Sequence, residues 1–99
     1  MRALEIDSKE PSALAELSLV LYKGKLLDIA LKTVDKALAV DAKNPTALWV
    51  KAQILTEKDD LAAIQFWQRF LEVVPQGVEA DRARQSLNEA LPRFIRRRN

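Results

Sequence analysis

The sequence contains no cysteine and no histidine among its 99 residues. The first absence excludes disulfides, thiolate ligands and a thiol nucleophile, and the second removes the commonest general base near neutral pH. Together they remove the usual protein ligands of zinc and haem. The sequence also lacks a glycine-rich phosphate loop and a Gly-x-Ser-x-Gly motif. We therefore expect a protein that is not an enzyme and that holds neither a metal nor a cofactor.

Turn-forming residues are scarce as well, with two glycines and four prolines. A many-stranded sheet needs more turns than these residues provide, whereas 48% apolar residues are too many for a disordered chain. The longest apolar run, "LAELSLVLY", is interrupted by Glu16 and is far shorter than the roughly 20 residues of a membrane-spanning helix. The composition favours one small all-α domain without a transmembrane segment.

Apolar residues recur at the spacing of an amphipathic helix from Pro11 onward. The residues on this face are Leu14, Leu17, Ser18 and Leu21. Gly24 favours the left-handed backbone that ends a helix, and a second apolar series at helical spacing covers residues 27–38. The pattern predicts a helix, a short turn and a second helix.

The same plan returns further along the chain, because "KEPSALAEL" begins at Lys9 and "KNPTALWVK" begins at Lys43. We call the separation of Lys9 and Lys43 the repeat interval. Asn44 and Pro45 predict a capped helix start. The next two helices are expected to bury Leu48, Ala52, Leu55, Ala63, Trp67, Phe70 and Leu71, with Val50 or Ile54 as alternative core positions. A fifth helix is expected over residues 78–92, where Pro92 ends or kinks it.

These residues resemble the tetratricopeptide repeat (TPR) family, whose unit is a helix–turn–helix with a period of about 34 residues, equal to the repeat interval. The positions that match the family signature in the first unit are Leu14, Leu17, Ser18, Leu21, Ala30, Val34 and Ala37. The resemblance implies an all-α stack of antiparallel helix pairs, forming part of a right-handed superhelix with a C-terminal capping helix. The expected units are the end of an incomplete preceding repeat (1–9), two repeats (10–44 and 45–77), a capping helix (78–92) and a basic tail (93–99).

The second unit departs from the family pattern in two ways. Lys51 stands where the family has a large apolar residue. The turn "TEKDD" is also one residue short, so the separation of Ala30 and Ala63 is one less than the repeat interval. We expect an irregular second repeat.

The resemblance also implies a function, because stacked TPR units expose a concave groove that commonly holds a peptide or a helix of another protein. The groove positions of the family correspond here to Ala15, Leu19, Tyr22, Lys23, Trp49, Val50 and Gln53. The clamp with which some TPR proteins hold a C-terminal carboxylate has no counterpart, since its positions hold Ala15, Leu19 and Val50. The resemblance therefore implies a non-catalytic scaffold for a protein or peptide partner, with an apolar or amphipathic segment as its ligand. Trp49 and Leu19 are either anchors for that ligand or ordinary core residues.

One stretch, "AIQFWQRFLEVVPQGVEADRARQSLNEA", is also similar to the closing repeat of bacterial TPR subunits of cytochrome c maturation, which hold the unfolded apocytochrome. This alternative implies a periplasmic protein whose partner carries the haem. The sequence leaves the compartment open between cytoplasm and periplasm.

The C-terminal tail concentrates positive charge. Its arginines are Arg93, Arg96, Arg97 and Arg98, and it has no acid, whereas residues 1–92 carry 12 basic and 14 acidic side chains. Such a cluster is suited to contact with nucleic acid or an anionic membrane. No aromatic stacking platform accompanies it, so we favour a solubilising end over a nucleic-acid contact.

The first residues, "RALEIDSK", align with "KALAVDAK" when shifted by the repeat interval. The chain is therefore expected to open inside the second helix of a preceding repeat, as a fragment of a longer array. Such an end leaves apolar residues without their usual partners and favours association between copies. The residues predicted to form this homo-oligomeric contact are Leu4, Ile6, Leu14, Leu17 and Leu21.

Overall fold

The computed structural model describes residues 11–98, and the side chains of residues 12–91. This part of the chain forms five helices and no strands. They are α2 (Pro11–Lys23), α3 (Leu27–Val40), α4 (Pro45–Glu57), α5 (Ala62–Val73) and α6 (Val78–Arg98). The all-α class predicted from the sequence is confirmed for these residues. None of these helices is long and apolar enough to cross a membrane.

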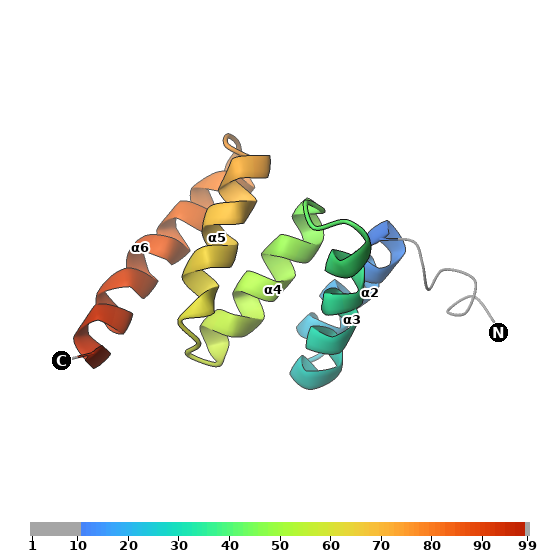
Figure 1. The fold of residues 1–99 in the computed structure, drawn as a ribbon, viewed down its shortest axis with the longest axis horizontal. Helices are drawn as coiled ribbons and strands as arrows, with labels where there is room; N and C mark the ends of the chain where they lie inside the picture. The colour runs from blue at the N-terminus through green and yellow to red at the C-terminus, as the bar shows by residue number, and fades with distance from the viewer. Residues whose placement is uncertain (1–10, 99) are drawn as a thin grey trace.

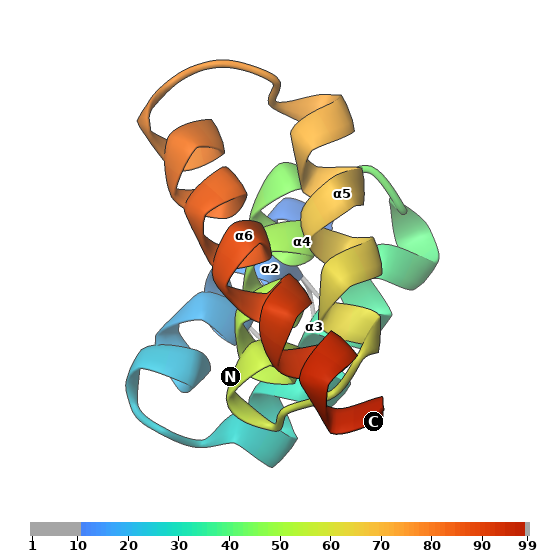
Figure 2. The same ribbon diagram turned by 90° about the vertical axis from the view of Figure 1, so that its left-hand side faces the viewer.

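The helices pack as two successive pairs followed by a single helix (Figure 1). The most extensive contacts are between α2 and α3 and between α4 and α5. α4 also packs against α2 and α3, and α6 packs against α5. Viewed nearly end-on in Figure 2, α4 lies behind α5 and α6 and in front of the first pair. α4 is therefore the central helix, because it contacts both its own partner and the preceding pair.

The turn after α2 has the hydrogen bonds of a Schellman motif. The N–H of Lys25 donates to the carbonyl of Tyr22 at 2.9 Å, and the N–H of Leu26 donates to the carbonyl of Leu21 at 2.9 Å. Lys25 has a left-handed backbone, with φ of 68°. These two bonds satisfy carbonyls that the last turn of the helix leaves without a partner.

The turn after α4 repeats this arrangement. The N–H of Asp59 donates to the carbonyl of Thr56 at 3.1 Å, and the N–H of Asp60 donates to the carbonyl of Leu55 at 2.8 Å. Asp59 is left-handed, with φ of 61°. Lys25 and Asp59 are separated by the repeat interval, so the two turns have the same form at the spacing of the sequence repeat.

The prediction that Gly24 takes the left-handed position of the first turn is wrong by one residue. Lys25 takes that position, while Gly24 is the last residue before it and its N–H donates to the carbonyl of Val20 at 3.0 Å. A methyl group at Gly24 would meet only the carbonyl oxygens of Val20 and Leu21, at 3.5 and 3.6 Å. The turn therefore does not depend on the conformational freedom of this glycine.

The second unit is one residue shorter than the first, and the difference is at the start of α5. The sequence had predicted it in the preceding turn, "TEKDD". In the first pair, the N–H of Ala30 donates four positions back, to the carbonyl of Leu26 at 2.9 Å. In the second pair, the N–H of Ala63 donates only three positions back, to the carbonyl of Asp60 at 2.9 Å. A tighter first turn thus absorbs the deletion without disturbing the Schellman motif before it.

α4 begins as the sequence predicts. The side chain of Asn44 accepts a hydrogen bond from the N–H of Ala47 at 3.0 Å, and Pro45 occupies the first helical turn. The cap satisfies one backbone donor that the helix itself cannot satisfy. The predicted capped start is confirmed.

Two apolar faces of α4 are buried, each in a different cluster. The face toward the first pair carries Ala47, Val50 and Ile54, and the face toward α5 carries Leu48, Ala52 and Leu55. All six side chains are at most 6% exposed. The two core alternatives that the sequence left open are therefore both occupied, because a helix in the middle of a stack needs an apolar face on each side.

α6 is apolar on one face only. Ala80, Ala83 and Ala90 are buried, whereas Asp81 and Arg84 are exposed. The helix runs through Pro92 to Arg98, so the expectation that it ends at Pro92 is wrong, and the alternative of a kink stays a prediction. The boundary between a capping helix and a separate tail at residue 92 does not coincide with the end of the helix.

Candidate functional site

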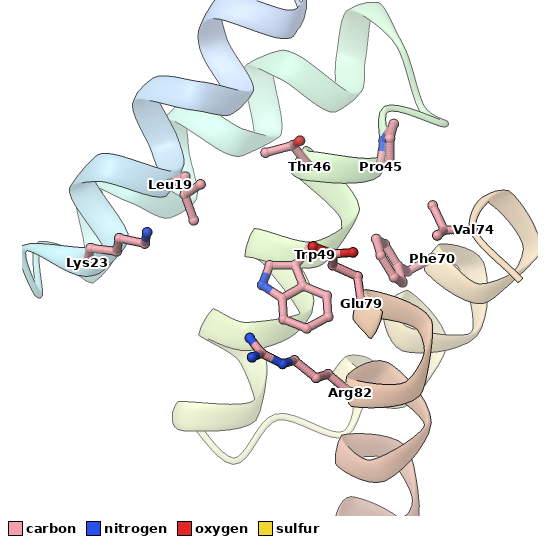
Figure 3. Close-up of a pocket in the computed structure, with 9 residues that line it drawn as sticks. All are labelled: Leu19, Lys23, Pro45, Thr46, Trp49, Phe70, Val74, Glu79 and Arg82. Carbon is pink, nitrogen blue, oxygen red and sulfur yellow. The ribbon is translucent and has the colours of Figure 1, made fainter. Parts of the chain in front are cut away.

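A concave cleft of about 420 Å³ lies between α2, α4 and α6, with the end of α5 on its far side (Figure 3). The residues that line it are Leu19, Lys23, Pro45, Thr46, Trp49, Phe70, Val74, Glu79 and Arg82. Four of these are large apolar or aromatic residues, and three are charged. The cleft therefore combines an apolar surface with charged side chains at its margin.

Trp49 is the central side chain of the cleft. Its ring meets Trp67 edge to face, with centroids 4.9 Å apart, and meets Phe70 at 5.3 Å. The side chain is half-buried and faces the cleft with its remaining surface. Trp49 thus packs in the second core cluster and also lines the cleft, so the two alternatives considered from the sequence are not exclusive.

Two partly buried hydrogen bonds hold the side chains beneath Trp49. The indole N–H of Trp67 donates to Oγ1 of Thr56 at 3.0 Å, and this hydroxyl donates to the carbonyl of Ala52 at 2.7 Å. Trp67 is fully buried and Phe70 is 3% exposed. Because buried, hydrogen-bonded aromatic groups have few alternative rotamers, Trp49 lies on a rigid base.

The charged side chains come from opposite sides of the cleft. Lys23 extends from α2, whereas Glu79 and Arg82 extend from the first turns of α6 (Figure 3). Among the residues that the structure describes, neither Lys23 nor Arg82 has a side-chain partner in an ion pair or hydrogen bond. Both cations are therefore available to a ligand.

Tyr22 lies beside the cleft and joins the two helix pairs. Its hydroxyl donates to Oε2 of Glu57 at 2.5 Å, linking the ends of α2 and α4. Burial, followed by the hydrogen bond and the negative charge of Glu57, raises the pKa of Tyr22 to about 12. The hydroxyl is already engaged, which removes its donor from any interaction with a ligand.

Three of the seven predicted groove residues, Leu19, Lys23 and Trp49, line the cleft. Tyr22 and Gln53 are half-buried and do not line it.

The expectation for Ala15 and Val50 requires correction. They are 1% and 0% exposed, and both belong to the first core cluster. α2 and α4 pack together, and these side chains are buried in that part of the core. Neither presents a surface to a partner.

The contributions of α5 and α6 to the cleft were not predicted from the sequence. Phe70 was assigned to the core alone, and Glu79 and Arg82 were not considered. α4 begins at Pro45 and α6 at Val78, a separation one short of the repeat interval, so α6 stands where the first helix of a third unit would begin. From this spacing, the first turns of α6 could have been predicted to lie on the same concave side as α2 and α4.

The five residues predicted to form the self-association contact differ in burial and in whether the structure describes them. Leu4 and Ile6 lie outside the described residues. Leu14 is 8% exposed, and Leu21 packs against the first cluster, so both serve the core of their own pair. Leu17 is half-buried.

The outer face of α2 differs from the corresponding face of α4 at one position. Glu16 and Val20 precede Val50 and Ile54 by the repeat interval. Val50 and Ile54 are both 0% exposed, whereas Glu16 is exposed and Val20 is 65% exposed. On α2, Glu16 therefore interrupts the face that corresponds to the apolar surface through which α4 packs on the preceding pair.

Lys51, which departs from the TPR pattern, has a structural role. Its ammonium pairs with Asp35 of α3 and lies 5.1 Å from the ring centroid of Phe66 of α5. Its side chain is 19% exposed, so its methylene stem is largely covered. The lysine therefore fills the space of an apolar residue while its charge remains paired.

The arginines of the C-terminal segment are placed by backbone only. Arg93, Arg96, Arg97 and Arg98 belong to α6, and their side chains lie outside the described part of the chain. Their predicted contact with an anion stays a prediction.

The described residues contain no group of three or more carboxylates or other metal-binding side chains that could hold a metal ion. In comparison with known proteins, no family model matches the chain, and no curated protein is significantly similar to it. The function is therefore inferred from the geometry of the cleft and from the repeated helix pairs.

Proposed function

We propose that this chain is a non-catalytic protein-interaction module, a TPR-like stack of helix pairs that binds an apolar or amphipathic segment of another protein. The binding site is the concave cleft between α2, α4 and α6. The single observation that carries the proposal is the position of Trp49, which is half-buried on a rigid aromatic base and faces the cleft.

Tryptophan in this setting suits a binding anchor. A half-buried indole leaves apolar surface in water that a partner can cover, and aromatic residues dominate the energetics of protein interfaces. The base formed by Trp67 and Phe70 limits the motion of Trp49. Little conformational entropy would then be lost when a ligand binds.

The size of the cleft is consistent with a side-chain anchor. Its volume of about 420 Å³ falls in the lower part of the range of roughly 300–1,000 Å³ for ligand sites. Such a space accommodates one or two bulky side chains of a peptide, while the rest of the segment follows the concave surface. The ligand we propose is accordingly a segment with bulky apolar residues on one face.

The TPR-like arrangement has two supports of its own. The turns after α2 and α4 have the same hydrogen bonds and are separated by the repeat interval, which equals the period of the TPR family. α4 buries one face on the preceding pair and the other on its own partner, as a helix in a stack of repeats must.

Tryptophan fluorescence tests the proposal, because the chain has two tryptophans in different environments. In a Trp67→Phe variant, Trp49 is the only indole, and titration with amphipathic peptides should shift its emission to shorter wavelength. The matched Trp49→Phe variant keeps the buried Trp67 and should show no shift. Equal responses to amphipathic peptides and to polar peptides of the same length would contradict the proposed function.

A further inference from the structure

Three hydrogen-bond donors around the cleft have no protein acceptor in the part of the chain that the structure describes. They are the ammonium of Lys23, the guanidinium of Arg82 and the indole N–H of Trp49. Within the described residues, none of them forms a hydrogen bond or an ion pair. They come from α2, α6 and α4, and Figure 3 shows the two charged side chains extending toward the space beside the indole ring.

Another arginine on the same helix as Arg82 does have an ion-pair partner. Arg84 pairs with Asp81, three positions earlier, at 3.0 Å. Glu79 also lies three positions before Arg82, yet within the described part of the chain the two form no ion pair. The guanidinium of Arg82 is therefore left without a carboxylate although one is close in the sequence.

The charge of the cleft differs from that of its surroundings. The cleft carries two cations, Lys23 and Arg82, and one acid, Glu79. Residues 12–91 together carry 10 basic and 11 acidic side chains. A site with a net positive charge attracts an anionic group and disfavours a cationic one.

The donors adjoin an apolar surface formed by Leu19, Trp49, Phe70 and Val74. A ligand that only filled this surface would make no use of the two exposed cations at its margin. A ligand with a carboxylate next to a bulky apolar group would satisfy both parts of the site. Charge-assisted hydrogen bonds to carboxylates are stronger than those to neutral acceptors.

From this combination we infer that the cleft selects a partner segment in which an aspartate or glutamate stands next to a bulky apolar residue. The apolar side chain packs on Trp49 and Phe70, and the positive charges of Lys23 and Arg82 stabilise the carboxylate. The inference rests on the proposed function, because it names the class of segment that the same cleft binds. It assigns the carboxylate to a side chain of the partner.

Fluorescence anisotropy with three labelled peptides tests the inference. The peptides share one sequence with a central Leu-Phe pair, have acetylated and amidated ends, and carry Glu, Gln or Lys beside the pair. The Glu peptide should bind about fivefold or more tightly than the Gln peptide, and the Lys peptide should bind most weakly. The preference should fall when the salt concentration is raised.

A double variant identifies the groups responsible. Lys23→Gln with Arg82→Gln should abolish the preference, so that the Glu and Gln peptides bind this variant with equal affinity. The matched control is Lys32→Gln with Lys36→Gln, which removes two exposed cations of α3 at positions that do not line the cleft. The control should retain the full preference.

The outcomes separate this inference from the function on which it rests. Equal binding of the Glu and Gln peptides, with the Trp49 signal intact, would overturn the carboxylate preference and leave the proposed function standing. Binding of none of the three peptides would overturn both. A fourth peptide has Gln beside the pair and a free C-terminus, and tight binding of it alone would show that the cleft takes a terminal carboxylate, which would also overturn the inference.

Discussion

The indole rings of Trp49 and Trp67 lie edge to face, with centroids 4.9 Å apart and planes inclined by 84°. Trp67 is fully buried, whereas Trp49 reaches from this contact into the cleft. The pair therefore connects the core of the second helix pair directly to the candidate binding site. Changes at the two positions should separate stability from binding.

Trp67→Ala should lower the free energy of unfolding by about 3–5 kcal/mol, because it removes a fully buried side chain and leaves a cavity. Trp49→Ala should lower the free energy of unfolding less than Trp67→Ala does, because the ring of Trp49 is only half-buried. The loss should still exceed that of a surface substitution, because the ring contacts Trp67 and Phe70. Chemical denaturation followed by circular dichroism measures both. A smaller loss for Trp67→Ala than for Trp49→Ala would contradict this assignment.

Ala30→Leu should destabilise the first helix pair. Ala30 is 0% exposed and belongs to the first core cluster. A larger side chain overpacks this contact, at a cost of about 1–3 kcal/mol. Ala39→Leu, on the exposed face of the same helix, is the control and should change the thermal midpoint little. Equal midpoints for the two variants would show that Ala30 has room for a larger side chain.

The turn after α2 should be improved by moving its glycine one position. Lys25 holds a left-handed backbone, so Lys25→Gly should raise the free energy of unfolding by about 0.5–1 kcal/mol. Gly24→Ala should also raise it, by about 0.4–1 kcal/mol, because the added methyl meets only ordinary contacts. Destabilisation by Gly24→Ala would mean that the left-handed residue is Gly24.

The ionisation of Tyr22 should be displaced to high pH. It is the only tyrosine in the chain, so ultraviolet absorbance of tyrosinate reports it directly. Its pKa of about 12 exceeds the ordinary value of 10.0 because of burial first and Glu57 second. Glu57→Gln should lower the pKa but leave it above 10.0, since burial remains. A pKa at its ordinary value in the wild type would contradict the contact with Glu57.

The raised pKa of Tyr22 also determines the direction in which stability changes with pH. The folded protein holds the phenol proton more tightly than the unfolded chain does. The contribution of Tyr22 is therefore fully present below pH 10.0 and is lost as the pH rises toward about 12. In Glu57→Gln this loss should begin at the same pH and end at a lower one.

Glu16→Val should promote association between copies of the chain. The change would join Ala13 and Val20 into an apolar surface on α2 like the one through which α4 packs on the first pair. Glu72→Val, on the exposed surface of α5, is the control. Sedimentation should show a larger shift toward oligomers for Glu16→Val than for Glu72→Val, relative to the wild type. Equal shifts toward oligomers for the two variants would mean that the loss of a negative charge, and not the apolar surface of α2, causes the association.

The sequence by itself determined the class of fold and the positions of its helix pairs. Helical spacing of apolar residues and the Asn44–Pro45 start are local signals, because each depends on residues within one or two turns. The buried alanines followed from the same spacing: Ala30 and Ala37 were predicted from the pattern and are both 0% exposed.

Only the tertiary structure decided which faces remain exposed. Ala15 and Val50 occupy groove positions of the repeat pattern, yet both are buried because α2 and α4 pack closely there. The cleft brings together Lys23, Phe70 and Arg82 from three helices. The spacing of α4 and α6 indicates the side on which Arg82 lies, but it does not determine which side chains of the other helices line the cleft with it. Helical periodicity determines the face of its own helix to which a side chain belongs, but the neighbour that covers this face depends on how the helices pack.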